Sequence, residues 1–379
     1  MSSISSSPKK YRFGFILSTS LGNLTRYQIL RKYAERDPEI DFTWAPVKHY
    51  IAPGEVNPFA RWPKFLQRRA IPIHQSWPVL GRLSSFDAIL VHMYEVDILL
   101  AIRSYFRRRP LRVNSTDDAP VLDPATYPLH VVDARKSALK RAVRLRVDLW
   151  RARRVDAQIP LSPWAGDILI HGAGVPANRV TPIHVGVDLE EWPFVDRKQR
   201  VGATRKKILF VGGDFIRKGG ALLLDVFDRS FAQTAELHLV TKYPIASQSP
   251  AVHVYNDLSP QDPRLVALYQ ACDVMALPTT ADLSSWAALE AMASGCAVIT
   301  TRSGGIRNLI DDGVTGLFVP PGDAAALERA LRELIDDDDR RTAMVAKARA
   351  SVEANFSAAV NVPRILSVMK ALVRERRAA

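Results

Sequence analysis

Short apolar runs alternate along the chain with longer stretches in which apolar residues recur at helical spacing. This alternation predicts parallel β-strands joined by crossover helices, the pattern of an α/β protein. The candidate strands form two series. The first series is Phe13–Ser18, Ile40–Ala45, Ala88–His92, Leu111–Asn114, Ala157–Leu161 and Val180–His184. The second is Lys207–Gly212, Glu236–Thr241, Val252–Tyr255, Val274–Leu277, Ala297–Thr301 and Gly316–Val319.

A polar stretch at residues 191–206 separates the two series of strands. One hydrophobic core rarely grows beyond about 250–300 residues, so a chain of 379 residues is expected to fold as two domains. We predict two Rossmann-like parallel-sheet domains, 1–190 and 207–360, facing each other across a cleft. Residues 361–379 form a predicted C-terminal helix that packs back on the first domain.

The first candidate site segment follows the strand Lys207–Gly212. It holds Gly213, Arg217 and Lys218 before an apolar helix. Glycine lets a ligand approach the backbone closely, and the free amides at a helix start favour phosphate. The two cations would add charge-assisted hydrogen bonds. The alternative is an ordinary glycine turn with a solvated basic pair.

The second segment runs from Pro278 to Gly295 and carries two carboxylates. Ser284 or Ser285 can cap a helix in which Glu290 occupies the second turn, and Asp282 precedes that helix. A buried carboxylate needs partners, and two neighbouring sugar hydroxyls can both donate to it. The alternative is a turn aspartate and a surface glutamate. A third glycine loop at residues 302–316 again follows a strand, so all three loops are expected at one sheet edge.

These segments resemble the retaining nucleotide-sugar glycosyltransferases of family 4, which have the GT-B fold. The resemblance covers residues 155–350 well and rests on Asp282-x7-Glu290, Gly304-Gly305 and the run 312–316. A further match joins 161–164 to the Gly-Val-Asp at 186–188. The resemblance implies that residues 207–360 bind the nucleotide sugar and that 1–190 lie on the acceptor side. It places Asp282 at the donor sugar, Glu290 at the ribose hydroxyls and Lys218 at the pyrophosphate.

The chain departs from the family pattern in the same segments. Gly213 stands where the family usually has arginine, and our hypothesis is that Arg217 replaces that cation. Asp282 is one methylene shorter than the usual glutamate. Leu283 and Ser285 stand where glycines usually follow it, which bears on the backbone contacts to the donor.

The first domain offers weaker signals. Gly22 lies in a turn after the first strand, and by resemblance that turn reaches the donor phosphates and the acceptor. Asp117 follows the strand Leu111–Asn114, and Asp118 is the second candidate at this place. By resemblance, relatives have an acidic residue there, close to the reacting centre. We assign these two the catalytic role of orienting the acceptor hydroxyl or stabilising positive charge on the sugar. The alternative is an Asx turn before Pro120.

The formal charge of +13 is concentrated in the first domain. Residues 1–190 hold 28 Lys or Arg against 17 Asp or Glu, a net charge of +11. Residues 135–154 combine nine of these cations with an apolar stripe, which is typical of a helix lying on an anionic membrane. A helix packed on the sheet with a solvated basic face fits the same pattern. No RNA-recognition signature accompanies the charge, so we predict no nucleic-acid partner.

Further features bear on the compartment. Cys272 and Cys296 lie in apolar runs and are expected to be free thiols in a reducing environment. The first ten residues lack the apolar core of a signal peptide, and no window reaches the length of a membrane span. We therefore expect a cytoplasmic protein, peripheral at a membrane if the basic helix binds lipid.

The expected function is transfer of a sugar from a nucleotide sugar to an acceptor hydroxyl, with retention of anomeric configuration. The acceptor is a sugar, a lipid-linked molecule or another small molecule. We expect no cofactor and no metal, and interpret the acidic run 336–339 as a joint between two surface helices. Three alternatives stay open: a nucleotide-sugar epimerase, a non-catalytic nucleotide-sugar-binding scaffold and a basic nucleic-acid-binding protein.

Overall fold

The computed structural model describes residues 10–19, 23–48, 51, 55–92, 94–104, 110–116, 137–196, 205–247, 249–260 and 262–379. The described residues divide into two compact units. The first unit contains the described residues up to 116 together with 137–185 and 359–379, and the second contains those between 186 and 358. The chain thus changes unit between 185 and 186, five residues before the predicted limit at 190, and returns to the first unit after 358.

The first unit is built on a five-stranded parallel sheet of order β2-β1-β3-β4-β5. Apolar side chains on both faces of β1 and β3 are buried, such as the successive residues Phe15 and Ile16, as expected for a sheet covered by helices. The strands are β1 (Tyr11–Ser18), β2 (Ile40–Val47), β3 (Ala88–His92), β4 (Leu111–Asn114) and β5 (Ala157–Gln158). The helices are α1 (Asn23–Ala34), α2 (Lys64–Gln75), α3 (Trp77–Leu80), α4 (Tyr94–Arg103), α6 (Ala138–Ala152), α7 (Pro163–Asp167) and α13 (Ala358–Ala378).

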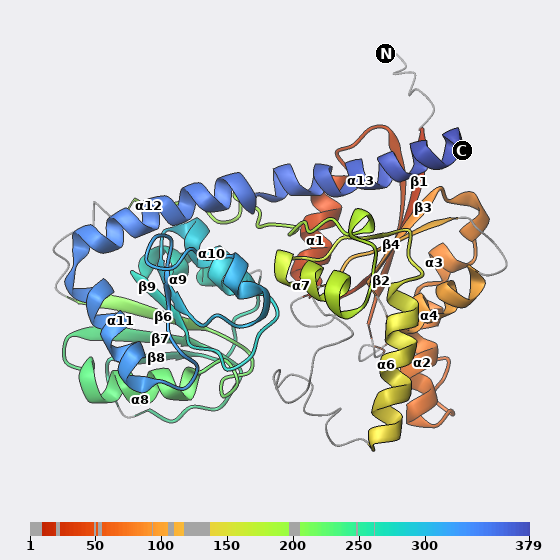
Figure 1. The fold of residues 1–379 in the computed structure, drawn as a ribbon. Helices are drawn as coiled ribbons and strands as arrows, with labels where there is room; N and C mark the ends of the chain where they lie inside the picture. Colours follow the sequence, from red (N-terminus) through yellow and green to blue (C-terminus); the bar gives the residue numbers. More distant parts are fainter. Residues whose placement is uncertain are drawn as a thin grey trace, which may run out of the picture. The chain divides into compact units, whose positions relative to one another are not determined.

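The second unit contains a six-stranded parallel sheet of order β11-β10-β9-β6-β7-β8. Figure 1 labels the strands β9, β6, β7 and β8 of this sheet. The central strands β6, β9 and β10 form the middle of its hydrophobic core. The strands are β6 (Lys206–Val211), β7 (Ala235–Val240), β8 (Val252–Tyr255), β9 (Val274–Leu277), β10 (Ala297–Thr300) and β11 (Leu317–Phe318). The helices are α8 (Gly220–Ser230), α9 (Pro263–Ala271), α10 (Trp286–Ser294), α11 (Ala324–Asp336) and α12 (Asp338–Asn355). The prediction of two parallel-sheet α/β domains is confirmed.

The predicted strand Val180–His184 is wrong. The segment runs beside residues 158–160, where Thr181 donates to the Gln158 carbonyl at 2.9 Å and Ile183 to the Pro160 carbonyl at 2.9 Å. Pro160 has no N–H to donate back to this segment, so the ladder between the two segments cannot continue. Only an isolated bridge at Val180 remains, and β5 ends at Gln158 for the same reason.

The C-terminal helix α13 belongs to the first unit from residue 359 onward. The Lys370 ammonium lies 2.8 Å from a carboxylate oxygen of Asp37 and 2.7 Å from one of Glu39. The Arg377 guanidinium lies 3.1 Å from Asp87. These ion pairs join the end of the chain to loops at the amino-terminal ends of β2 and β3.

The acidic run 336–339 is a helix joint, as predicted. Helix α11 ends at Asp336 and α12 begins at Asp338, while the Asp337 side chain caps α12 by accepting from the Arg340 N–H at 2.8 Å. Carboxylates at a helix start also interact favourably with the helix dipole. Among the described residues no helix has both the length and the apolar character needed to cross a membrane. Both cysteines are free and buried.

Candidate functional site

The glycine loop after β6 packs closely against the loop after β9. Gly219 has a φ of +80°, and a Cβ atom there would lie 2.1 Å from the Pro278 carbonyl oxygen. Only glycine tolerates both this conformation and this contact. The Arg217 carbonyl accepts a hydrogen bond from the Thr280 N–H at 2.9 Å. The glycine therefore lets the two loops share main-chain hydrogen bonds at the carboxyl edge of the sheet.

Arg217 holds the glycine loop together. Its Nε donates to the Asp214 carboxylate at 2.9 Å, and its Nη1 donates to the Ala281 carbonyl. The guanidinium thus braces the loop in this state. Gly213, in the same loop, is exposed, and a Cβ atom added there would meet no atom within 4 Å. The position can therefore accept a long side chain such as arginine.

Lys218 and Asp282 face each other across the two loops. The Lys218 ammonium lies 3.2 Å from Asp282 Oδ2, and the Asp282 side chain is 12% exposed. The other oxygen of Asp282 accepts from the Leu283 N–H at 3.1 Å, and the Asp282 N–H donates to Ser303 Oγ at 2.8 Å. Asp282 thereby links the loops after β6, β9 and β10. The expected convergence of the three loops on one sheet edge is confirmed.

Glu290 is a buried carboxylate on α10. Ser285 caps this helix by accepting from the Ala288 N–H at 3.2 Å, and Ser284, half-buried, precedes the cap. Glu290 is 7% exposed, so the alternative of a surface glutamate is wrong. The Tyr269 hydroxyl on α9 donates to Glu290 Oε2 at 3.0 Å. One carboxylate oxygen therefore has a fixed protein partner.

The surroundings of Glu290 set its ionisation. Burial raises its pKa from 4.5 to about 7, against the lowering effects of the Tyr269 hydrogen bond and the positive charge of Lys218. The negative charge of Glu191 acts in the raising direction. A carboxylic acid with a pKa raised by burial and facing a specific cation is typical of functional sites. The positive charge of Lys218 therefore acts on the Glu290 carboxylate and favours its ionised form.

A hollow of about 470 Å³ adjoins the same loops. Thr280 from the loop after β9 and Ser303 and Gly304 from the loop after β10 line one part of it. Arg302 lines another part, where its guanidinium pairs with Asp312 at 2.9 Å and lies 4.6 Å from the centre of the Phe318 ring. The volume falls within the range of about 300–1,000 Å³ that small-molecule sites occupy.

The predicted site residues divide into two groups. Arg217, Lys218, Asp282 and Ser285 lie in the converging loops or at the start of α10, and Glu290 follows on that helix. Gly22, Asp117 and Asp118 lie outside the described residues.

Sequence reasoning missed two residues of this site. Tyr269 belongs to an apolar helix and no motif marks it, while its hydroxyl is the partner of Glu290. Ser303 lies beside the glycines of the third loop, and its hydroxyl bonds the Asp282 main chain. The position of Ser303 at a strand end, next to Gly304, was the available signal.

A protein-family model matches the part of the chain that carries this site. Residues 205–337 match the family model of the glycosyl transferases group 1. A D-inositol 3-phosphate glycosyltransferase of Corynebacterium kroppenstedtii is 43% identical over 88 residues, which is 23% of this chain and 20% of the relative. A glycogen synthase of Mycobacterium tuberculosis is 26% identical over 253 residues, covering 62% of this chain and 59% of the relative. The matches thus span less than two thirds of the length of these relatives.

Solved structures extend the likeness to nearly the whole chain. Sucrose-phosphate synthase from Thermosynechococcus elongatus superposes with a TM-score of 0.76 at 18% identity, covering 96% of this chain and 100% of that one. Anabaena HepE in complex with UDP and glucose gives a TM-score of 0.68 at 18% identity, covering 95% and 100%. These likenesses show the GT-B fold. Residues 205–337 therefore match the domain of the glycosyl transferases group 1, and the chain as a whole has the GT-B fold.

Proposed function

We propose that this chain transfers a sugar from a nucleotide diphosphate sugar to the hydroxyl of a sugar, lipid-linked or other small acceptor. The observation that carries the proposal is the buried Glu290 held by Tyr269 within the electrostatic reach of Lys218, at the carboxyl edge of the second sheet. Ligands of open α/β sheets bind at that edge. HepE, which has the same fold, was solved with UDP and glucose, which supports a donor of this class.

Each residue has a distinct part in this proposal. Tyr269 occupies Oε2 of Glu290 and leaves Oε1 to accept hydrogen bonds from ribose or sugar hydroxyls. The Lys218 ammonium moves from Asp282 to the diphosphate, and the amide dipoles at the start of α8 add to the positive field there. Arg217 braces the loop that positions these amides. Asp282, once released from Lys218, faces the donor sugar.

The chemistry follows from where charge develops. The bond between the anomeric carbon and the diphosphate breaks, and the leaving group gains negative charge that Lys218 and the helix amides stabilise. A side-chain cation and amide dipoles can do this work without a metal, and no cofactor is needed. Under this proposal the acceptor enters on the same face as the leaving phosphate, which removes the acceptor proton, so anomeric configuration is retained.

A thermal-shift screen of nucleotide sugars tests the proposed function. A donor at about 100 times its Kd stabilises the folded state by about 2.7 kcal/mol. We expect one nucleotide sugar to raise the melting temperature and to be consumed only when an acceptor is present. Conversion of the donor without acceptor would identify an epimerase, and binding with no turnover in any acceptor mixture would identify a scaffold.

Donor binding should depend on pH through Glu290. The ionised carboxylate is the form that accepts hydroxyl hydrogen bonds, and its pKa is about 7. We therefore expect donor affinity to rise about tenfold between pH 6 and pH 8. Calorimetry with an intact nucleotide sugar measures this, since a terminal phosphate would itself titrate near pH ~6. Constant affinity across this range would contradict the assignment.

The stability of the free chain should change in the opposite direction. Because folding raises the Glu290 pKa from 4.5 to about 7, the stability this group contributes is complete below pH 4.5 and is lost as pH rises through 7. The melting temperature of the free chain should therefore fall over this interval, relative to that of Glu290→Gln. Parallel curves for the two chains would show that Glu290 does not titrate as inferred.

The basic helix α6 supports a second element of the proposal, peripheral binding to an anionic membrane at its cytoplasmic face. Leu139 and Val143 are 74% and 54% exposed, one turn apart, and Lys140, Arg141 and Arg144 are exposed beside them. Apolar side chains flanked by cations suit the interface of an anionic bilayer. The buried free thiols of Cys272 and Cys296 fit a reducing compartment.

Vesicle flotation tests the membrane element. The chain should float with vesicles containing phosphatidylserine at low salt, less at moderate salt, and not with neutral vesicles, because the attraction is screened. Leu139→Ser with Val143→Ser should reduce the floated fraction severalfold. Val360→Ser, at an exposed position of α13, is the matched control and should float normally. Equal flotation with neutral vesicles would remove the electrostatic explanation.

A further inference from the structure

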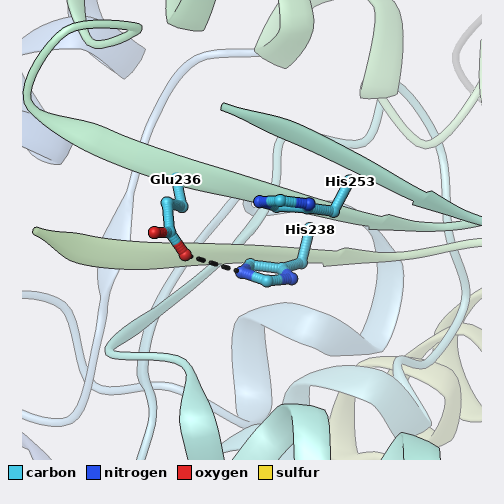
Figure 2. Close-up of side chains that lie close together, drawn as sticks. All are labelled: Glu236, His238 and His253. Carbon is cyan, nitrogen blue, oxygen red and sulfur yellow. Dashed lines mark ion pairs between the residues drawn. The ribbon is translucent and has the colours of Figure 1, made fainter. Parts of the chain in front are cut away.

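Three residues of types that bind metals lie together on one face of the second sheet, on β7 and β8. Glu236 and His238 are two residues apart on β7, so their side chains leave the same face. His253 on β8 is the direct parallel partner of His238 in the strand register. Figure 2 shows the two imidazoles stacked, each with one ring nitrogen on the side of Glu236. The fold therefore brings two histidines and one carboxylate together from distant parts of the sequence.

The distances are short enough for a shared ligand. One ligand atom from each residue lies within 4.8 Å of the others, and His238 Nε2 is 3.5 Å from Glu236 Oε2. The two rings have centroids 4.8 Å apart and are inclined by 24°. Small side-chain rotations would bring the three atoms to the ~2.0–2.2 Å from a common centre that zinc requires.

His238 supplies an independent sign that something is bound here. The residue is 6% exposed, and its Nε2 is buried without a hydrogen-bond partner among the described residues. A buried polar atom without a partner costs about 1–3 kcal/mol. A metal ion at Nε2 would remove this cost.

Tyr255 orients the ring in the manner of a metal-bound histidine. Tyr255 lies on β8, two residues beyond His253, and its hydroxyl is 3.1 Å from His238 Nδ1. A metal-ligating imidazole usually donates its second N–H to an oxygen acceptor, which fixes the tautomer and directs the other lone pair at the metal. In the tautomer whose Nδ1–H donates to Tyr255, Nε2 carries the lone pair that a metal ion would accept.

We propose that Glu236, His238 and His253 bind one divalent transition-metal ion of the zinc class. Two imidazole nitrogens and one carboxylate oxygen are a donor set that zinc accepts, with a fourth position for water. The ion would join β7 to β8, which is the edge strand of its sheet. Glu236 lies near the amino-terminal end of β7, whereas the donor loops follow the carboxyl ends of the strands. The site is thus structural and separate from the donor chemistry.

Lys207 provides a further test of the proposal. Its ammonium lies 3.3 Å from Glu236 Oε2, the oxygen that faces His238. A metal ion must displace this ammonium, which competes for the same oxygen. Lys207→Met should therefore bind zinc more tightly than the natural chain does, a direction that loss of structure would not produce.

The test is calorimetric titration of the metal-free full chain with zinc sulfate, together with melting curves. We expect one zinc ion per chain and a higher melting temperature. Tyr255→Phe should weaken zinc binding by about 10–100-fold, and His253→Ala by more than that. His171→Ala removes an exposed histidine of the first unit as a matched control and should bind normally.

Cobalt binding identifies the ligands. Tetrahedral cobalt(II) should absorb in the visible range without the near-ultraviolet band of a cobalt–thiolate bond, because Cys272 and Cys296 are not ligands. Should His253→Ala misfold by circular dichroism, Tyr255→Phe and Lys207→Met still decide the question by their opposite shifts. Unchanged zinc affinity in both of these variants, or a thiolate band, would overturn the proposal.

Discussion

Glu290→Gln is expected to bind the nucleotide sugar about 100-fold more weakly than the natural chain, because the amide carries no charge and offers one acceptor oxygen where the carboxylate offers two. The substitution keeps the size of the side chain and an oxygen acceptor for the Tyr269 hydroxyl. It removes the charge and replaces the second carboxylate oxygen with an NH2 group, which cannot accept a hydrogen bond from a ligand hydroxyl. Glu290→Ala should abolish detectable binding. Isothermal calorimetry with the best donor from the thermal-shift screen measures both losses.

The matched control for Glu290 is a carboxylate elsewhere in the same unit. Glu353 is 53% exposed and pairs with Arg349 on α12, so Glu353→Gln should bind the donor normally. The melting temperature of Glu290→Gln should not fall at pH 8, since the natural carboxylate is ionised and costly to bury there. Normal donor affinity in a folded Glu290→Gln chain would exclude Glu290 from the site and with it the proposed function.

The fold could be predicted from the sequence because a buried strand or helix needs a local pattern of apolar residues, which the sequence shows directly. Strands buried on both faces read as short apolar runs, and β3 and β4 begin and end at the predicted residues. The prediction failed at Val180–His184, where the apolar pattern continues but Pro160 of the neighbouring segment has no N–H to donate to the ladder. Hydrophobic pattern and hydrogen-bonding capacity are separate requirements, and a strand needs both.

The candidate site was predictable only in part, because its energetics depend on contacts between distant segments. Glycine loops after strands marked Lys218 and Asp282, yet nothing in the sequence indicated that they pair across 3.2 Å. Tyr269 lies 21 residues before Glu290 on a different helix. Its hydrogen bond to Glu290 depends on how α9 and α10 pack together, which the sequence does not indicate. The cluster on β7 and β8 likewise depends on strand register, which local pattern does not specify.

Lys218→Ala is expected to weaken binding of a nucleoside diphosphate by about 10–100-fold and leave nucleoside binding nearly unchanged, because the lost interaction is a charge-assisted one to phosphate. Part of the loss will come from Asp282, whose carboxylate loses its ion-pair partner and then repels the diphosphate. The double variant Lys218→Ala with Asp282→Asn removes that repulsion. Its affinity should therefore lie between those of Lys218→Ala and the natural chain.

A cation introduced at Gly213 tests whether this loop binds a diphosphate. Nothing lies within 4 Å of a Cβ atom at this exposed position, so Gly213→Arg should fold normally. In the Lys218→Ala background the new guanidinium should recover about tenfold in diphosphate affinity and nothing in nucleoside affinity. Arg217→Ala, in contrast, removes the brace to Asp214 and Ala281 and should lower the melting temperature as well as the affinity. Equal losses for nucleoside and diphosphate in Lys218→Ala would show that this ammonium supports the loop and does not contact phosphate.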